Sequence, residues 1–147
     1  MTIGRNCFTM WLLQEEGVAN MNLVYYFTRT GNSEKIAQDI AAQVGGEVRH
    51  IDDDKNWKGI IGFIRGGYYA SSKKKTDALY EKPGDGDSIY LCFPVWANTF
   101  PPAVRAFVDE VGKGKITAVA SSGGGGLKER DGFVKVIDVL KDQRVEL

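Results

Sequence analysis

A cluster of hydroxyl and amide side chains follows the first apolar run of the chain. Thr28-Arg29-Thr30-Gly31-Asn32-Ser33 stands between the apolar run Met21 to Phe27 and a helical pattern from Glu34 to Val44. The first N–H groups of a helix have no intrahelical acceptor and carry the positive end of the helix dipole, so they can bind a phosphate. Gly31 permits a positive φ, and Asn32 can cap the helix. We therefore predict a phosphate-binding turn; the alternative is an ordinary capped turn.

Two further loops of unusual composition follow later apolar runs. Pro94-Val95-Trp96-Ala97-Asn98-Thr99 comes after Ile89–Phe93, and Ser121-Ser122-Gly123-Gly124 comes after Ile116–Ala120. A large aromatic side chain such as Trp96 at a strand end can stack on a planar ring, although a Trp that caps the core is the alternative. Asn98 tolerates the left-handed backbone conformation better than most residues. These loops predict a second and a third wall of one binding site.

The elements that must position these loops alternate along the chain. We expect strands at 23–27, 47–51, 89–93 and 116–120, the second of them at a sheet edge. Helices are expected at 34–44, at 57–68, from Pro101-Pro102 to Val111, and at Phe133, Val136, Ile137 and Leu140, while Val145–Leu147 can begin a fifth strand. This alternation predicts an α/β fold with an open parallel sheet and helices on both faces, which binds ligands beyond the carboxyl ends of its strands.

From Met21 to about Leu140 the chain resembles the flavodoxin family, whose members are small electron carriers that bind FMN. The resemblance is carried by the turn TRTGNS, by PVWANTFPPAVRAFV and by SSGGGG. It implies strand order 2-1-3-4 with a partial fifth strand. It also implies that Thr28, Arg29, Thr30, Gly31, Asn32 and Ser33 surround the FMN phosphate and that Trp96 stacks on the flavin. Pro94, Val95, Ala97, Asn98 and Thr99 would line the ring, with Ser121, Ser122, Gly123 and Gly124 near the ribityl chain or pyrimidine.

The function implied by this resemblance is a flavin electron carrier that exchanges one or two electrons with a reductase and an acceptor protein. A stacked, poorly solvated flavin pocket disfavours the anionic hydroquinone, which favours one-electron traffic. The alternatives are an NAD(P)H- or quinone-linked FMN oxidoreductase and a truncated domain that no longer holds flavin. A response regulator would need acidic residues after the first strand, whereas Asp52–Asp54 follow the second and are expected in a solvated loop. A low-molecular-weight phosphatase would need a Cys in the first turn, which contains none.

The chain departs from the family in charge, in its loops and at its ends. Residues 21–147 hold 18 basic and 17 acidic residues instead of an acidic excess, and the third loop has no aromatic residue. Arg29 adds a charge to the phosphate turn. The expected C-terminal strand and helix are missing, so a segment with Phe8, Trp11, Leu12 and Leu13 is expected to cover the bare sheet face, with self-association as the alternative.

Composition limits the remaining possibilities. The chain has 147 residues, of which 43% are hydrophobic, and this predicts one domain at 21–147 after an extension at 1–20. Equal numbers of basic and acidic residues, 19 each, give no reason to expect nucleic acid or an anionic membrane as partner, and no apolar stretch is long enough to span a bilayer. Cys7 and Cys92 are expected to be reduced, as in a cytoplasmic protein. A single histidine, His50, offers neither a metal cluster nor a catalytic triad, and we expect neither metal nor catalytic residues.

Overall fold

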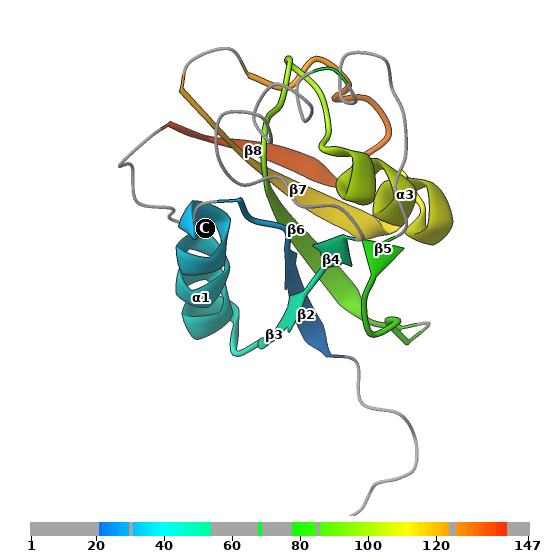
Figure 1. The fold of residues 1–147 in the computed structure, drawn as a ribbon. Coiled ribbons are helices and arrows are strands. Elements are labelled where there is room, and N and C mark those ends of the chain that lie inside the picture. Colours follow the sequence, from blue (N-terminus) through cyan, green and yellow to red (C-terminus); the bar gives the residue numbers. More distant parts are fainter. Residues whose placement is uncertain are drawn as a thin grey trace, which may run out of the picture.

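The chain builds a parallel sheet with a helix packed on each of its two faces (Figure 1). A computed structural model describes residues 21–29, 31–53, 68, 78–84, 86–123 and 126–140. Its strands and helices are β2 (Asn22–Tyr26), α1 (Asn32–Val44), β3 (Glu47–His50), β4 (Asp52–Asp53), β5 (Ala78–Leu79), β6 (Ser88–Pro94), α3 (Pro102–Val111), a 3-10 turn η1 (Lys113–Lys115), β7 (Ile116–Ser122) and β8 (Lys135–Leu140).

The sheet has the strand order β3-β2-β6-β7-β8, and every neighbouring pair is parallel. Counted along the chain this is the order 2-1-3-4-5, so the predicted strand order is confirmed and the sheet includes a complete fifth strand. The predicted position of β3 at an edge of the sheet is also confirmed among the described residues. Buried strands of this kind are rich in β-branched and aromatic residues, as Leu23-Val24-Tyr25 illustrates.

Alternate residues of each strand pack under different helices. Val24, Cys92 and Val119 point to the α1 side, where they meet Ile36, Ala37 and Ile40 in one apolar cluster. Tyr25, Leu91 and Ala118 point to the other side and pack with Val104, Phe107 and Val108 of α3. This alternation is the period of two that a strand imposes, and it confirms that helices cover both faces.

The prediction of a last helix is wrong, because residues 135–140 form strand β8. Phe133, Val136, Ile137 and Leu140 fit a helical spacing, but a run this short fits both periods. Val136, Ile137 and Val139 are β-branched, which favours a strand, and Val139 is 3% exposed against the α1 side of the sheet. The fifth strand therefore begins ten residues earlier than Val145.

The connection from β7 to β8 crosses the sheet without a helix among its described residues. Leu127 is buried in the α3-side core, and the ring of Phe133 packs on Phe100 with centroids 6.0 Å apart. The N–H of Val134 then donates to the carbonyl of Ile116 at 2.9 Å, which returns the chain to the start of β7. Side chains of this irregular segment thus cover a sheet face that a crossover helix covers in most parallel sheets.

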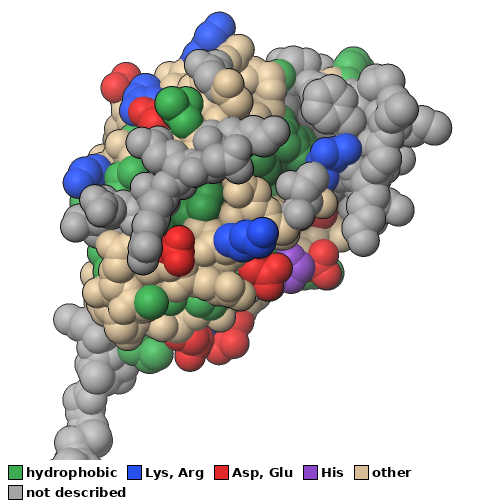
Figure 2. Space-filling view, turned by 90° about the vertical axis from the view of Figure 1, so that its left-hand side faces the viewer, with side chains coloured by type: hydrophobic (Ala, Val, Ile, Leu, Met, Phe, Trp, Pro, Cys, Tyr) green, Lys and Arg blue, Asp and Glu red, His purple; other side chains and the backbone are tan. Residues whose placement is uncertain are grey.

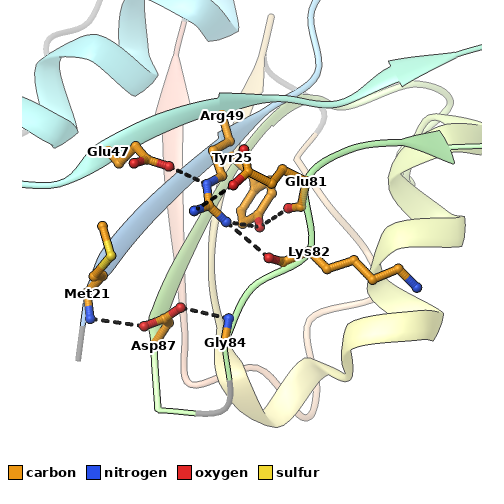
Figure 3. Close-up of polar contacts among 8 residues, drawn as sticks. All are labelled: Met21, Tyr25, Glu47, Arg49, Glu81, Lys82, Gly84 and Asp87. Atoms are coloured by element: carbon orange, nitrogen blue, oxygen red, sulfur yellow. Dashed lines mark hydrogen bonds and ion pairs between the residues drawn. The ribbon is translucent and has the colours of Figure 1, made fainter. Parts of the chain in front are cut away.

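A second, two-stranded sheet joins the edge of the main one. Asp52 and Asp53, expected in a solvated loop, instead form β4 and pair antiparallel with β5. The segment after β5 is tied to the main sheet by Arg49, whose Nη1 donates to the Tyr25 hydroxyl at 3.2 Å and to the Lys82 carbonyl at 3.1 Å (Figure 3). The Tyr25 hydroxyl donates in turn to the carbonyl of Glu81. Burial is the main cause that raises the pKa of Tyr25.

Several sequence-based expectations fall outside the described residues. They concern the extension at 1–20 with its proposed covering segment, Cys7, the predicted helix at 57–68 apart from Tyr68, Thr30, Gly124 and the residues 145–147. In the part of the chain that the structure describes, no helix is both long and apolar enough to cross a membrane.

Candidate functional site

The three predicted loops follow neighbouring strands and lie at the same edge of the sheet. The N–H of Phe27 donates to the carbonyl of Cys92 at 3.0 Å, which joins the ends of β2 and β6. Pro94 pairs with Ser121, and the N–H of Val95 donates to the carbonyl of Ser121 at 2.8 Å, which joins the ends of β6 and β7. The carboxyl ends of parallel strands form the usual ligand-binding edge of such sheets.

The first loop has the backbone geometry of an anion-binding turn. Gly31 lies immediately before α1 with φ 95°, and its N–H donates to Oγ1 of Thr28 at 2.8 Å. A Cβ atom at Gly31 would lie more than 4 Å from every described atom outside its two chain neighbours. The 13-residue helix α1 directs its first N–H groups toward this turn.

Ser33, in the first turn of α1, is the polar residue most withdrawn from solvent among the described residues of this loop. It is 1% exposed, and its hydroxyl has no hydrogen-bond partner among the described residues. A buried hydroxyl without a partner costs free energy, roughly 1–3 kcal/mol, unless a ligand or water satisfies it. Such a group beside free helix N–H donors fits a phosphate oxygen.

Two residues at the start of α1 also affect this loop: Asn32 does not have the predicted capping role, and Glu34 adds a negative charge. Asn32 was expected to cap α1, but Gly31 occupies the cap position and no side chain makes a cap hydrogen bond. Asn32 is exposed as the first helical residue, because the helix begins two residues before Glu34. Glu34 places one acidic group in the first turn of α1. Burial is the main cause that raises the pKa of Tyr26, and the Glu34 carboxylate adds to this increase.

The second loop is a two-residue turn with an unusual backbone. The N–H groups and carbonyls of Trp96 and Thr99 exchange two hydrogen bonds of 3.0 Å. Between them Ala97 and Asn98 have φ values of 52° and 63°, and they are the non-glycine residues with positive φ in the described chain. Asn98 thus takes a conformation that its residue type tolerates, whereas the same conformation at Ala97 was not expected.

Trp96 is half-buried and lies against Phe27, which precedes the first loop. Its ring meets the ring of Phe27, the residue before Thr28, with centroids 5.6 Å apart at an interplanar angle of 76°. Trp96 also packs on the α3-side core, which is the contact expected of a core-capping Trp. Its packing therefore places the indole next to the first loop, while its role in stacking on a ligand stays a prediction.

The third loop closes against the second. The buried Ser121 hydroxyl donates to the carbonyl of Phe93 at 3.3 Å, so it stabilises the strand ends. Ser122 is half-buried in the last position of β7, and Gly123 is exposed. Asn98 bridges the two loops, because its Nδ2 donates to the carbonyl of Gly126 at 3.3 Å and its own carbonyl accepts from the N–H of Lys128 at 2.9 Å.

A buried ion pair, which the sequence analysis missed, lies behind these two loops. Nη2 of Arg105 donates to Oε1 of Glu129 at 2.8 Å and to Oγ1 of Thr99 at 2.8 Å. The Thr99 hydroxyl donates in turn to Glu129. Arg105 is the one basic residue in the sequence of α3, but nothing in the sequence pairs it with a residue 24 positions away. A buried charge needs a partner, and that need was the available signal.

Other reactive groups lie away from the site. Cys92 is fully buried in β6, and burial raises the pKa of its thiol. His50 is exposed at the end of β3, and its ring stacks on the ring of Tyr26 with centroids 4.9 Å apart. Basic and acidic side chains are interspersed on the side of the molecule shown in Figure 2, in keeping with the balanced composition.

Comparison with known proteins supports the fold and leaves the family open. No family model matches the chain. A protein from Archaeoglobus fulgidus is 37% identical over 95 residues, a match that covers 65% of this chain and 60% of that protein, and it has no described function. The matched part thus spans less than two thirds of that relative's length.

Solved structures of flavoproteins share the fold. A candidate flavoprotein from Bacteroides uniformis aligns with a TM-score of 0.70 at 22% identity, over 84% of this chain and 92% of the other. One from Bacteroides eggerthii aligns with a TM-score of 0.64 at 20% identity, over 86% and 91%. A flavoprotein from Lactobacillus acidophilus, solved in complex with FMN, aligns with a TM-score of 0.61 at 15% identity, over 83% and 93%. The chain therefore has a flavodoxin-like α/β fold.

Proposed function

We propose that the chain binds FMN at the loops that follow β2, β6 and β7, and that it serves as a flavin electron carrier. The fold is shared with flavoproteins, one of which is known in complex with FMN. Thr28, Arg29, Thr30, Gly31, Asn32 and Ser33 would surround the phosphate, and Trp96 would stack on the flavin. Pro94, Val95, Ala97, Asn98 and Thr99 would line the ring, and Ser121, Ser122, Gly123 and Gly124 the ribityl chain or pyrimidine.

The observation that carries this proposal is the buried Ser33 hydroxyl, which has no partner among the described residues. It belongs to the first turn of a 13-residue helix and follows a glycine with φ 95°. Through Phe27 the same turn contacts Trp96, the aromatic side chain of the next loop. A phosphate group and a planar ring in one molecule match these two features together.

FMN supplies the redox chemistry of such a protein, and the chain supplies binding and orientation. The N–H groups at the start of α1 and the hydroxyls of Thr28 and Ser33 would neutralise the phosphate charge. Glu34 works against this by repulsion. Trp96 and the loops around it would exclude water from one side of the ring.

A carrier of this kind exchanges electrons with a reductase and an acceptor protein. Residues 21–147 hold 18 basic and 17 acidic residues, so long-range charge attraction would contribute little to docking. We therefore expect electron-transfer rates with a partner to depend weakly on ionic strength.

The experiment compares FMN with riboflavin, which has the same ring and lacks the phosphate. Flavin fluorescence is titrated with the protein, and FMN should bind at micromolar concentration or below and riboflavin much more weakly. Ser33→Ala should weaken FMN binding by about tenfold and leave riboflavin unchanged. Ser88→Ala is the matched control, because Ser88 is exposed at the opposite end of β6.

The same experiment defines what would reject the proposal. Equal affinities for FMN and riboflavin would show that the turn does not bind the phosphate. Failure of FMN to bind at roughly 100 μM would reject flavin binding altogether. If FMN binds, NADPH is added without a reductase: bleaching of the flavin would identify an oxidoreductase in place of a carrier.

A further inference from the structure

The ion pair between Arg105 and Glu129 joins three segments that are distant in the sequence. Arg105 belongs to α3, Glu129 to the connection between β7 and β8, and Thr99 to the turn that follows β6. Nη1 of Arg105 also reaches Oε2 of Glu129 at 3.3 Å, so the two side chains meet through both ends of the guanidinium and both carboxylate oxygens. The guanidinium carbon also lies over the Phe100 ring, 5.2 Å from its centre.

These charges are withdrawn from water. The side chains of Arg105 and Glu129 are 10% and 26% exposed. The free energy needed to remove the two charges from water offsets much of the attraction between them. The pair therefore adds little net stability compared with apolar side chains of the same size. Removal of one partner, in contrast, leaves a buried charge unpaired and is strongly unfavourable. The pair is thus better suited to fixing an arrangement than to stabilising the chain as a whole.

The arrangement that it fixes is the Trp96–Thr99 turn. Ala97 and Asn98 both hold left-handed conformations. Asparagine tolerates this conformation, but alanine avoids it and keeps it only when its neighbours enforce it. Thr99 is bound by Arg105 and Glu129, while the Asn98 carbonyl accepts from Lys128, the residue before Glu129. Hydrogen bonds from the loop at 126–130 therefore hold the Trp96–Thr99 turn in this conformation.

We propose that Arg105 and Glu129 are positioning residues that hold the Trp96 turn in its ligand-binding form, so that the loops after β6 and β7 act as one element. This inference rests on the proposed function for the ligand, FMN. Its structural part concerns the chain alone and can be measured without FMN.

The experiment uses a chain with Trp96 as its single tryptophan, made by Trp11→Phe and Trp57→Phe, since the sequence has three tryptophans. In this background Glu129→Ala should increase quenching of Trp96 fluorescence by acrylamide, and it should raise the FMN dissociation constant by about tenfold. Asp138→Asn is the matched control. It removes the charge from the pair between Arg130 of the same connection and Asp138 of β8, whose side chains are 41% and 45% exposed, and it should change neither quantity.

A conservative pair of variants separates positioning from general stability. Thr99→Ser keeps the hydroxyl that Arg105 and Glu129 bind, and should retain wild-type quenching. Thr99→Val has nearly the same shape without the hydroxyl, and should behave like Glu129→Ala. If far-ultraviolet circular dichroism shows that Glu129→Ala is unfolded, Glu129→Gln takes its place, with an expected smaller effect in the same direction.

The outcomes decide each proposal separately. Equal Trp96 quenching and equal FMN affinity in the Glu129 and Asp138 variants would overturn the positioning role. Wild-type quenching in Thr99→Val would do the same. If wild type fails to bind FMN but Glu129→Ala still exposes Trp96, the proposed function is rejected and the positioning of the turn stands.

Discussion

The ring of Trp96 meets the ring of Phe27 at 76°, with the two centroids 5.6 Å apart. Phe27 follows β2 and immediately precedes Thr28, and Trp96 begins the turn after β6. One aromatic contact therefore connects the proposed phosphate turn with the proposed ring-binding turn. Such a contact stabilises by roughly 0.5–1.5 kcal/mol beyond the area that it buries.

Phe27→Leu should loosen this contact. We expect a loss of about 1–2 kcal/mol in the free energy of unfolding, measured by urea denaturation, together with weaker near-ultraviolet circular dichroism from Trp96. Phe107→Leu is the control, because Phe107 is equally buried but packs on Tyr25 and Tyr80. It should cost similar stability and leave the Trp96 signal unchanged; an equal change in both variants would contradict the prediction.

Gly31→Ala should weaken both folding and ligand binding. A side chain at φ 95° costs about 1–2 kcal/mol of stability, and the new methyl group would stand where the phosphate is proposed to lie. Gly45, at the other end of α1, has φ 67° and equally open surroundings. Gly45→Ala should therefore lose similar stability in urea denaturation and retain full FMN affinity. A loss of FMN affinity in both variants would assign the effect to the helix as a whole.

Ala97→Gly should stabilise the chain by about 0.5–1 kcal/mol. Glycine relieves the left-handed strain at φ 52°, and this gain exceeds the backbone entropy that glycine loses on folding. Ala106→Gly, in the interior of α3, should instead cost about 1 kcal/mol, because no strain is relieved there. Thermal denaturation of the two variants should show midpoints that move in opposite directions. A fall in both midpoints would mean that the turn does not strain Ala97.

The pair between Arg130 and Asp138 predicts a stability difference that depends on pH. Nη1 and Nη2 of Arg130 donate to the two carboxylate oxygens of Asp138 at 2.9 and 2.7 Å. These hydrogen bonds lower the pKa of Asp138 below its ordinary value of 3.8. A lowered folded-state pKa gives stability that is present above 3.8 and is lost as the pH falls through the folded-state value. Asp138→Asn should thus be slightly less stable than wild type at pH 7, and the difference should vanish toward pH 2.

The sequence predicts the regular part of this fold well, because local and global patterns agree there. In β6 a continuous apolar run gives a buried strand, and in α1 one apolar face ends at Gly45 in the left-handed conformation. The order of strands follows from the alternation of strands and helices together with the resemblance of the loops. The edge at which the loops gather follows from the parallel arrangement.

The errors of prediction arise where a short segment fits two patterns or where a partner is distant. Residues 133–140 satisfy the helical spacing and the preference for strands, and only the open edge beside β7 decides between them. The cap of α1 depends on the φ of Gly31, which the sequence does not fix. The link from Arg105 to Glu129 depends on how the β7–β8 connection crosses the sheet, and no local pattern encodes that path.

The β7–β8 connection also determines how the proposed ligand-binding edge of the sheet can open. The N–H of Lys128 is bound to the turn after β6, and the N–H of Val134 is bound to the start of β7. Leu127, immediately before the first of these anchors, is buried in the core. We expect the amides of Lys128 and Val134 to exchange with solvent deuterium only when these hydrogen bonds break, and the break at Lys128 would release the carbonyl of Asn98. Hydrogen exchange at Lys128 is accordingly a direct measure of how often the β7–β8 connection detaches from the turn after β6.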